Sequence, residues 1–232
     1  MHMRKTLFLM LLFCVPTLLQ AAPTVEEGQA AGYRFWLAEH HQVPVIEFRL
    51  YFKDAGYISD PEIKQGRAAL AAAMLMEGAG ERDAAAFARA LESTAAKLSV
   101  EAGRDGLTIS LTSLSEKMEE SFALLSDMLL KPRLEAGAIA KVKRQMKVAR
   151  QRQLESPYFL AEQAYNQAAY AGHPYAQQRL GSDESVAELT RQDIEVFLRQ
   201  YLAKDKAVIA IAGAITSQQA EQLLADHLDG LP

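Results

Sequence analysis

The chain has 232 residues, of which 50% are apolar and 23% are charged, and its formal net charge is −4 at pH 7. This length and composition are typical of one globular domain, or of two small ones, and exclude a disordered, fibrous or low-complexity protein. A mildly acidic chain is a poor general nucleic-acid binder, because neutralising phosphates requires a basic surface. The single cysteine, Cys14, excludes a disulfide framework and a thiolate zinc cluster.

Residues 1–21 have the pattern of a signal peptide. Arg4 and Lys5 form a short positive start, and an apolar run over residues 7–19 follows. That run is too short for a comfortable membrane span, and no later apolar stretch reaches spanning length. We expect cleavage after Ala21 and a mature protein that is periplasmic or secreted. The alternative is an N-terminal anchor that is not cleaved.

The next residues predict the start of one domain. Residues 22–30 are expected to be a polar lead-in, and residues 31–232 one domain without an internal linker. Alternation of buried and exposed positions is typical of a strand with one buried face, and Ile46, Phe48 and Leu50 follow this pattern. The elements expected in this part are strands over 33–37 and 43–52, helices over 66–77 and 83–94, and a β-hairpin over 98–111.

Helices dominate the second half of the chain. Apolar stripes at helical spacing predict helices, and one stripe runs from Ile139 through Val142 and Met146 to Ala149. Residues 207–212 form a continuous apolar run, which predicts a buried strand, and Thr216 with Gln219 has the pattern of a capping box for a last helix. Strands grouped in this way favour the α+β class, with a mostly antiparallel sheet and helices packed on one face.

The usual catalytic signatures are missing from the sequence. Gly78-Ala79-Gly80 lacks the third glycine of a dinucleotide loop and follows a helix, so it is interpreted as a helix end. There is no nucleophile elbow and no Walker loop. His40 and His41 lie between two predicted strands, where neighbouring side chains point to opposite faces and do not chelate one ion. No cofactor or metal is therefore expected.

One cluster of charge stands out. Lys141, Lys143, Arg144 and Lys147 lie in a run of twelve residues that contains six basic residues and no acidic one. They fall largely off the apolar stripe, so one interpretation is a solvated helix face. The other is a docking surface for an acidic partner. Nucleic acid ranks third, given the net charge.

The alanine-rich stretch over residues 66–78 carries a resemblance. It is similar to the first helix of the pitrilysin/insulinase family of zinc peptidases, the inverzincins, whose pattern is G-x-A-H-x-x-E-H-M-L-x-x-G. The matching positions here are Gly66, Ala68, Met74, Leu75 and Gly78. Further pieces resemble the family in order and spacing, from residue 30 to 232. The resemblance implies the N-terminal half of a family subunit.

The departures from that pattern affect the chemistry. Where the family has His, Glu and His, this sequence has Ala69, Ala72 and Ala73. The family's third ligand is a Glu on a later helix, and the matching stretch here contains Ala149 and Arg150 instead. A catalytic zinc requires three protein ligands and an open water position, and alanine supplies no lone pair. We therefore expect no enzyme activity from the chain alone, and Arg150 to bring positive charge towards the former metal position.

The resemblance also implies a second half, because family subunits usually contain two. Three hypotheses follow. The first is that the chain is a non-catalytic partner of an active zinc peptidase of the family, or of a separately encoded second half. In this role the chain holds peptide, which adds a strand to a sheet edge. The second is a free-standing peptide-binding or scaffold module, or a truncated fragment. The third, most remote, is an active zinc metalloendopeptidase that uses other ligands.

Overall fold

A computed structural model describes residues 24–232, so the predicted signal peptide, residues 1–21, lies outside the described residues. The strands of the main sheet are β1 (Val25–Ala30), β2 (Tyr33–Glu39), β3 (Val45–Lys53), β6 (Lys97–Ala102), β7 (Gly106–Leu114) and β8 (Ala207–Gly213). Their spatial order is β1-β2-β8-β3-β7-β6. All neighbours are antiparallel except β2 and β8, which are parallel. Strands β4 (Gly78–Ala79) and β5 (Arg82–Asp83) form a separate small ribbon.

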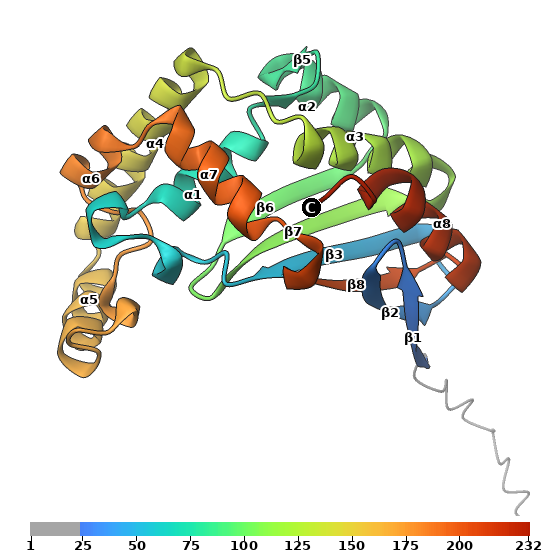
Figure 1. Ribbon diagram of the computed structural model, residues 1–232, viewed down its shortest axis with the longest axis horizontal. Coiled ribbons are helices and arrows are strands. Elements are labelled where there is room, and N and C mark those ends of the chain that lie inside the picture. The colour runs from blue at the N-terminus through green and yellow to red at the C-terminus, as the bar shows by residue number, and fades with distance from the viewer. Residues whose placement is uncertain (1–23) are drawn as a thin grey trace, which may run out of the picture.

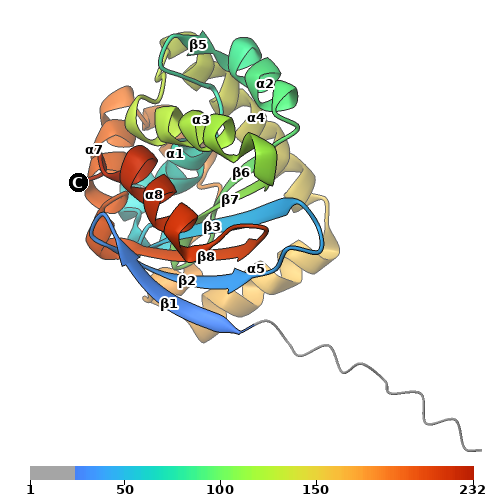
Figure 2. The same ribbon diagram turned by 90° about the vertical axis from the view of Figure 1, so that its right-hand side faces the viewer.

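Helices cover one face of this sheet. The α-helices of the described residues are α1 (Arg67–Leu75), α2 (Ala84–Ser93), α3 (Met118–Leu130), α4 (Ala136–Leu154), α5 (Pro157–Ala169), α6 (Asp183–Glu188), α7 (Arg191–Tyr201) and α8 (Ser217–Leu228). In two perpendicular views, α1, α3, α7 and α8 lie over the same side of the strands, whereas α5 stands away at one end (Figures 1 and 2). The predicted α+β class, with a mostly antiparallel sheet and helices on one face, is confirmed.

The core lies between the sheet and these helices. Ile46, Phe48 and Leu50 of β3 are fully buried, and the intervening Glu47 and Arg49 are exposed on the other face. Phe48 packs edge-on against Phe122 of α3, with ring centroids 4.9 Å apart. The period-two pattern therefore identifies the core face correctly, because each strand residue points opposite to its neighbour.

The expected polar lead-in over residues 22–30 was wrong, because residues 25–30 form strand β1. This strand pairs antiparallel with β2 and ends in a tight turn at Ala31 and Gly32, both with positive φ. Its side chains are mostly exposed, including Val25 at 62%. An edge strand of this kind is held by main-chain hydrogen bonds and needs no apolar alternation, so the pattern that predicts buried strands did not detect it.

Helix α1 is fixed at its start by a buried ion pair. Asp60 accepts hydrogen bonds from the backbone N–H groups of Gly66 and Ala68, each at 3.1 Å, and from Arg67 Nε at 3.2 Å. Burial raises the pKa of Asp60 to about 6, against the opposing effect of the Ala68 N–H group and the Arg67 charge. The Arg67 guanidinium also lies 5.3 Å from the ring centroid of Phe197 in α7. These contacts hold the start of α1 against Asp60 and against α7.

Within residues 24–232, none of the helices combines the length and the apolar character that crossing a lipid bilayer requires.

Candidate functional site

A groove lined by alanines opens between α1, α4 and β6, and we call it the alanine groove. Ala69, Ala72 and Ala73 form its wall on α1, because positions i, i+3 and i+4 share one face of a helix. Ala149 lines it from α4. The volume of the groove is about 310 Å³, and its other lining residues are Val100, Glu101, Ala102, Val142, Gln145, Met146, Gln153, Arg179 and Leu180. Four of the five former-site positions named from the sequence therefore meet in one place.

The fifth position, Arg150, points elsewhere, and the expectation that it brings charge to the groove was wrong. Its Nη1 donates to Asp183 Oδ1 at 2.7 Å, at the start of α6. Lys147 lies 3.2 Å from the same carboxylate, and these two cations hold the pKa of Asp183 below its usual range. Arg150 is not among the residues that line the alanine groove, and it lines a different pocket together with Asp183. The apolar stripe predicted that Ala149 lies in the core. Instead, Ala149 is exposed in the groove.

The residues present do not fit a zinc ion. The methyl groups of the three α1 alanines offer no lone pair, and in the described part of the chain no group of three or more His, Cys, Asp or Glu side chains is placed to hold a metal. Two of the histidines pair with carboxylates. His41 pairs with Glu39 at 2.6 Å and His227 with Glu119 at 3.1 Å. The groove supplies shape and apolar surface, and no group for zinc-assisted hydrolysis.

The free edge of β6 borders the alanine groove. Among residues 24–232, strand β6 is the last in the sheet and pairs only with β7, so its other edge has no strand partner there. Val100, Glu101 and Ala102 of this strand line the groove. An exposed strand edge is a template for one more strand, and a neighbouring hollow then receives alternate side chains of the added segment.

The basic cluster on α4 is largely paired within the chain. Lys141 pairs with Glu77, and Lys143 Nζ donates to the backbone oxygens of Ala187, at 2.8 Å, and of Leu189. Burial lowers the pKa of Lys143. Lys147 shares Asp183 with Arg150, so Arg144 is the one member of the predicted docking set with neither a salt bridge nor a side-chain hydrogen bond to another residue in 24–232. The docking surface stays a prediction, with less free charge than the sequence suggests.

Comparison with known proteins identifies the family. The model of the insulinase family (peptidase family M16) matches residues 35–183, which is more than half of the chain. The chain belongs to the insulinase family. The resemblance inferred from the residues of α1 and its surroundings is thus confirmed.

Three family relatives define what kind of member it is. A non-peptidase homolog, YmxG of Helicobacter pylori, is 31% identical over 99% of this chain and 53% of its own length. The crystal structure of a peptidase M16 inactive domain from Pseudomonas fluorescens has a TM-score of 0.85 and 30% identity, covering 90% of this chain and 51% of that one. Subunit 1 of the human mitochondrial cytochrome b-c1 complex is 26% identical over 77% of this chain and 37% of its own length.

The names of two of these relatives and the alanines of the groove both indicate a protein without peptidase chemistry. The chain is a non-catalytic, insulinase-like protein, and it spans about half the length of the relatives it matches. The three α1 alanines that the family resemblance singles out line one groove in the structure, because their spacing puts them on one side of the helix. The contributions of β6 and of residues 179–180 to the groove were missed, because no local pattern reports contacts between distant segments.

Proposed function

We propose that the chain is the peptide-holding, non-catalytic half of an exported zinc-peptidase assembly. In this role an extended peptide lies along the free edge of β6, and its side chains enter the alanine groove. The hydrolytic groups come from an H-x-x-E-H-bearing partner of the same family, or from a separately encoded second half. The signal-peptide pattern of residues 1–21 supports export to the periplasm.

The observation that carries this proposal is the alanine groove beside an unpaired strand edge. The groove keeps a volume of about 310 Å³ where the family has its metal groups, instead of being filled by larger side chains. An edge strand supplies main-chain hydrogen bonds to any extended peptide, and the hollow, lined by small side chains, leaves room for side chains of that peptide. Such a surface binds a substrate chain without cleaving it.

The relatives support the partner role. The human relative is, by its name, a subunit of a larger complex, and a relative from Schizosaccharomyces pombe is a probable subunit beta of the mitochondrial-processing peptidase. The chain corresponds to about half of the YmxG homolog. In the proposed assembly, the other half is a second polypeptide or another part of the same protein.

The test uses the mature chain and the H-x-x-E-H-bearing family member from the same cell. We expect the two to co-purify in near-stoichiometric amounts, and the chain to raise the partner's kcat/KM for a fluorogenic peptide. The variant Ala73→Phe should fill the groove and lower the affinity for a labelled peptide by at least about tenfold, or about 1.4 kcal/mol, without releasing the partner.

A matched control carries the same change outside the groove. Ala85 is exposed on α2, so Ala85→Phe should leave peptide binding and partner stimulation as in the parent chain. If the peptidase neither binds the chain nor responds to it, the partner role is wrong. If Ala73→Phe and Ala85→Phe bind peptide equally well, the groove is not the peptide site.

A further inference from the structure

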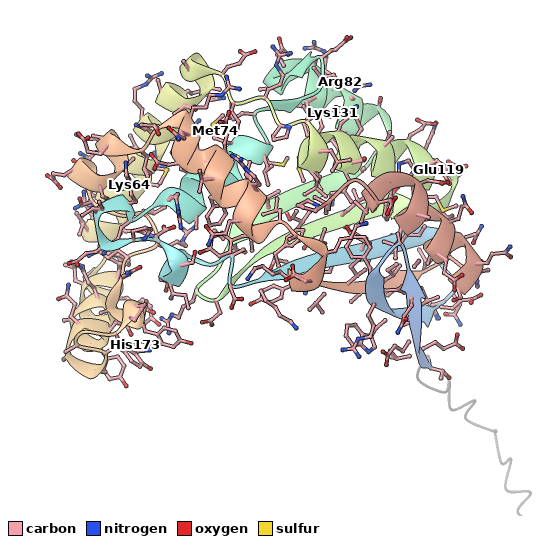
Figure 3. All side chains as sticks on the ribbon, viewed as in Figure 1. Lys64, Met74, Arg82, Glu119, Lys131 and His173 are labelled. Carbon is pink, nitrogen blue, oxygen red and sulfur yellow. The ribbon has the colours of Figure 1, made fainter. Side chains whose placement is uncertain are left out.

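A second pocket adjoins the alanine groove, and we call it the pocket beside α5. Its volume is about 240 Å³, and its walls come from residues 57, 104, 153–166 and 176–180. His173, shortly before the last of these segments, lies beside α5 at the end of the molecule opposite Glu119 (Figure 3). The pocket and the groove share Gln153, Arg179 and Leu180 as lining residues, so a ligand in the groove can extend into the pocket.

Arg104 is held in place on the wall of this pocket. It lies in the turn between β6 and β7, and a backbone hydrogen bond from Tyr57 N–H to Gly103 O, at 3.0 Å, fixes that turn. Arg104 Nε donates to Tyr57 Oη at 3.0 Å, and its guanidinium lies 5.0 Å from the ring centroid of Tyr175. Tyr175 Oη in turn donates to Asp105 Oδ1 at 2.8 Å. A guanidinium that is already fixed loses little freedom when it binds a ligand.

The pocket has more positive charge than its own carboxylate can neutralise. Within residues 24–232, Arg104 forms no salt bridge and donates a side-chain hydrogen bond through Nε alone, and Arg179 makes neither kind of contact. Glu162 is the one acidic residue among the described residues that line the pocket. A guanidinium binds a carboxylate through two parallel N–H···O bonds, and the amides of residues such as Gln163 and Asn166 offer further N–H donors. These walls favour a ligand that carries a carboxylate.

The position of Arg104 connects this chemistry with the free edge of β6. Strand β6 ends at Ala102, two residues before Arg104. Its last residues, Val100, Glu101 and Ala102, line the alanine groove. A peptide that pairs with this edge and continues past Ala102 therefore approaches Arg104. The carboxylate of Glu101 disfavours a second carboxylate in the groove itself, so an acidic group of the peptide is better placed in the pocket.

We propose that the pocket beside α5 binds a carboxylate of the held peptide, which is either an acidic side chain or the C-terminal carboxylate. This proposal rests on the proposed function, because it requires a peptide along β6. Both sources present the same group to Arg104 and Arg179. The C-terminal carboxylate reaches the pocket when the peptide runs parallel to β6, and an acidic side chain reaches it in either direction. The chain thereby selects which extended segments it holds.

The experiment measures binding of nonapeptides to the mature chain by fluorescence anisotropy. The peptides have a Ser/Val/Thr background, an uncharged fluorophore at the N-terminus and an amidated C-terminus, and a single Glu or Gln is moved through every position. A second series has no Glu and compares a free C-terminal carboxylate with the amide at several peptide lengths. In at least one series we expect the peptide with the carboxylate to bind about tenfold more tightly than its uncharged counterpart.

Two variants and one control locate the bound carboxylate. Arg104→Gln and Arg179→Gln each remove one guanidinium and should reduce the preference to within about threefold. Arg179 is exposed, so its variant keeps the test valid if Arg104→Gln disturbs the β6–β7 turn. Arg89→Gln removes the same charge from an exposed position of α2, outside both hollows, and should keep the full preference. Circular dichroism verifies that each variant is folded.

The outcomes separate this proposal from the proposed function. If no peptide binds, the peptide-holding function fails, and the carboxylate preference fails with it. If charged and uncharged peptides bind equally well and Ala73→Phe weakens them equally, the peptide-holding function stands and the carboxylate site is wrong. If the preference persists in both Arg104→Gln and Arg179→Gln, the carboxylate binds elsewhere on the chain and the proposal is overturned.

Discussion

Helices α1 and α5 line two adjoining pockets, yet they are built in opposite ways. Eight of the nine residues of α1 are buried, and its start is fixed by the Asp60–Arg67 pair. None of the thirteen residues of α5 is buried, and the helix packs mainly on α4 and the turn at 174–176. The difference separates two tasks. Helix α1 stabilises the fold and exposes few reactive or polar side chains. Helix α5 exposes polar side chains and contributes little to stability.

The largest expected change in unfolding free energy comes from removing Arg67, the partner of the buried Asp60 carboxylate. Arg67→Ala leaves Asp60 buried without its countercharge, which costs about 3–5 kcal/mol of unfolding free energy at neutral pH. Urea unfolding followed by circular dichroism measures it. The control is Arg82→Ala, whose partner Asp127 lies 3.1 Å away on the surface, with an expected loss below about 1 kcal/mol. Equal losses of unfolding free energy in the two variants would contradict a special role for the start of α1.

The second prediction concerns pH. Because burial raises the pKa of Asp60 from 3.8 to about 6, the folded state favours the neutral acid. The stability that comes from its protonation is complete below pH 3.8 and is lost as pH rises through 6. Relative to the always-neutral Asp60→Asn, the parent chain should therefore lose up to about 3 kcal/mol between pH 4 and pH 8. Parallel urea titrations across this range measure the difference, and a constant difference would contradict the assignment.

A backbone substitution at the start of α1 should have an intermediate effect. Gly66 has φ of 91°, and an added Cβ would lie 3.0 Å from both Leu180 O and Val186 Cγ2. We expect Gly66→Ala to cost about 2 kcal/mol, as backbone strain and crowding combine. Gly172 also has positive φ but nothing within 4 Å, so Gly172→Ala isolates the backbone part and should cost less. Thermal unfolding of both variants tests whether crowding adds to strain.

The smallest effect is expected on α5. Tyr158 is 78% exposed, so Tyr158→Ala should change the unfolding free energy by no more than about 0.5 kcal/mol. The measurement is the same urea titration as for Arg67→Ala. A loss as large as the one expected for Gly66→Ala would mean that α5 has a structural role comparable to that of α1. The division of tasks between the two helices would then have to be abandoned.

Sequence and structure agree where the determinants are local. The alternation in β3 and the capping box of Thr216 with Gln219 predicted elements that the structure confirms. The edge strand β1 was missed because its pairing depends on β2 and not on its own side chains. Arg150 was misplaced because its direction is decided by Asp183, which lies 33 residues away. The pocket beside α5 had no sequence signal, since its walls come from residues 57, 104, 153–166 and 176–180, which are far apart in the sequence.

The position of β8 in the sheet has a consequence for the order of folding. Strand β8 lies between β2 and β3 and pairs with both, although most of the chain separates it from them in sequence. The sheet therefore stays divided into two parts until residue 213 is available, and contacts of such long range make folding slow. A chain that emerges from a ribosome or a translocation channel with its N-terminus first exposes the facing edges of β2 and β3 throughout that time. These two edges are where a chaperone would be most effective, and where premature pairing between chains would begin.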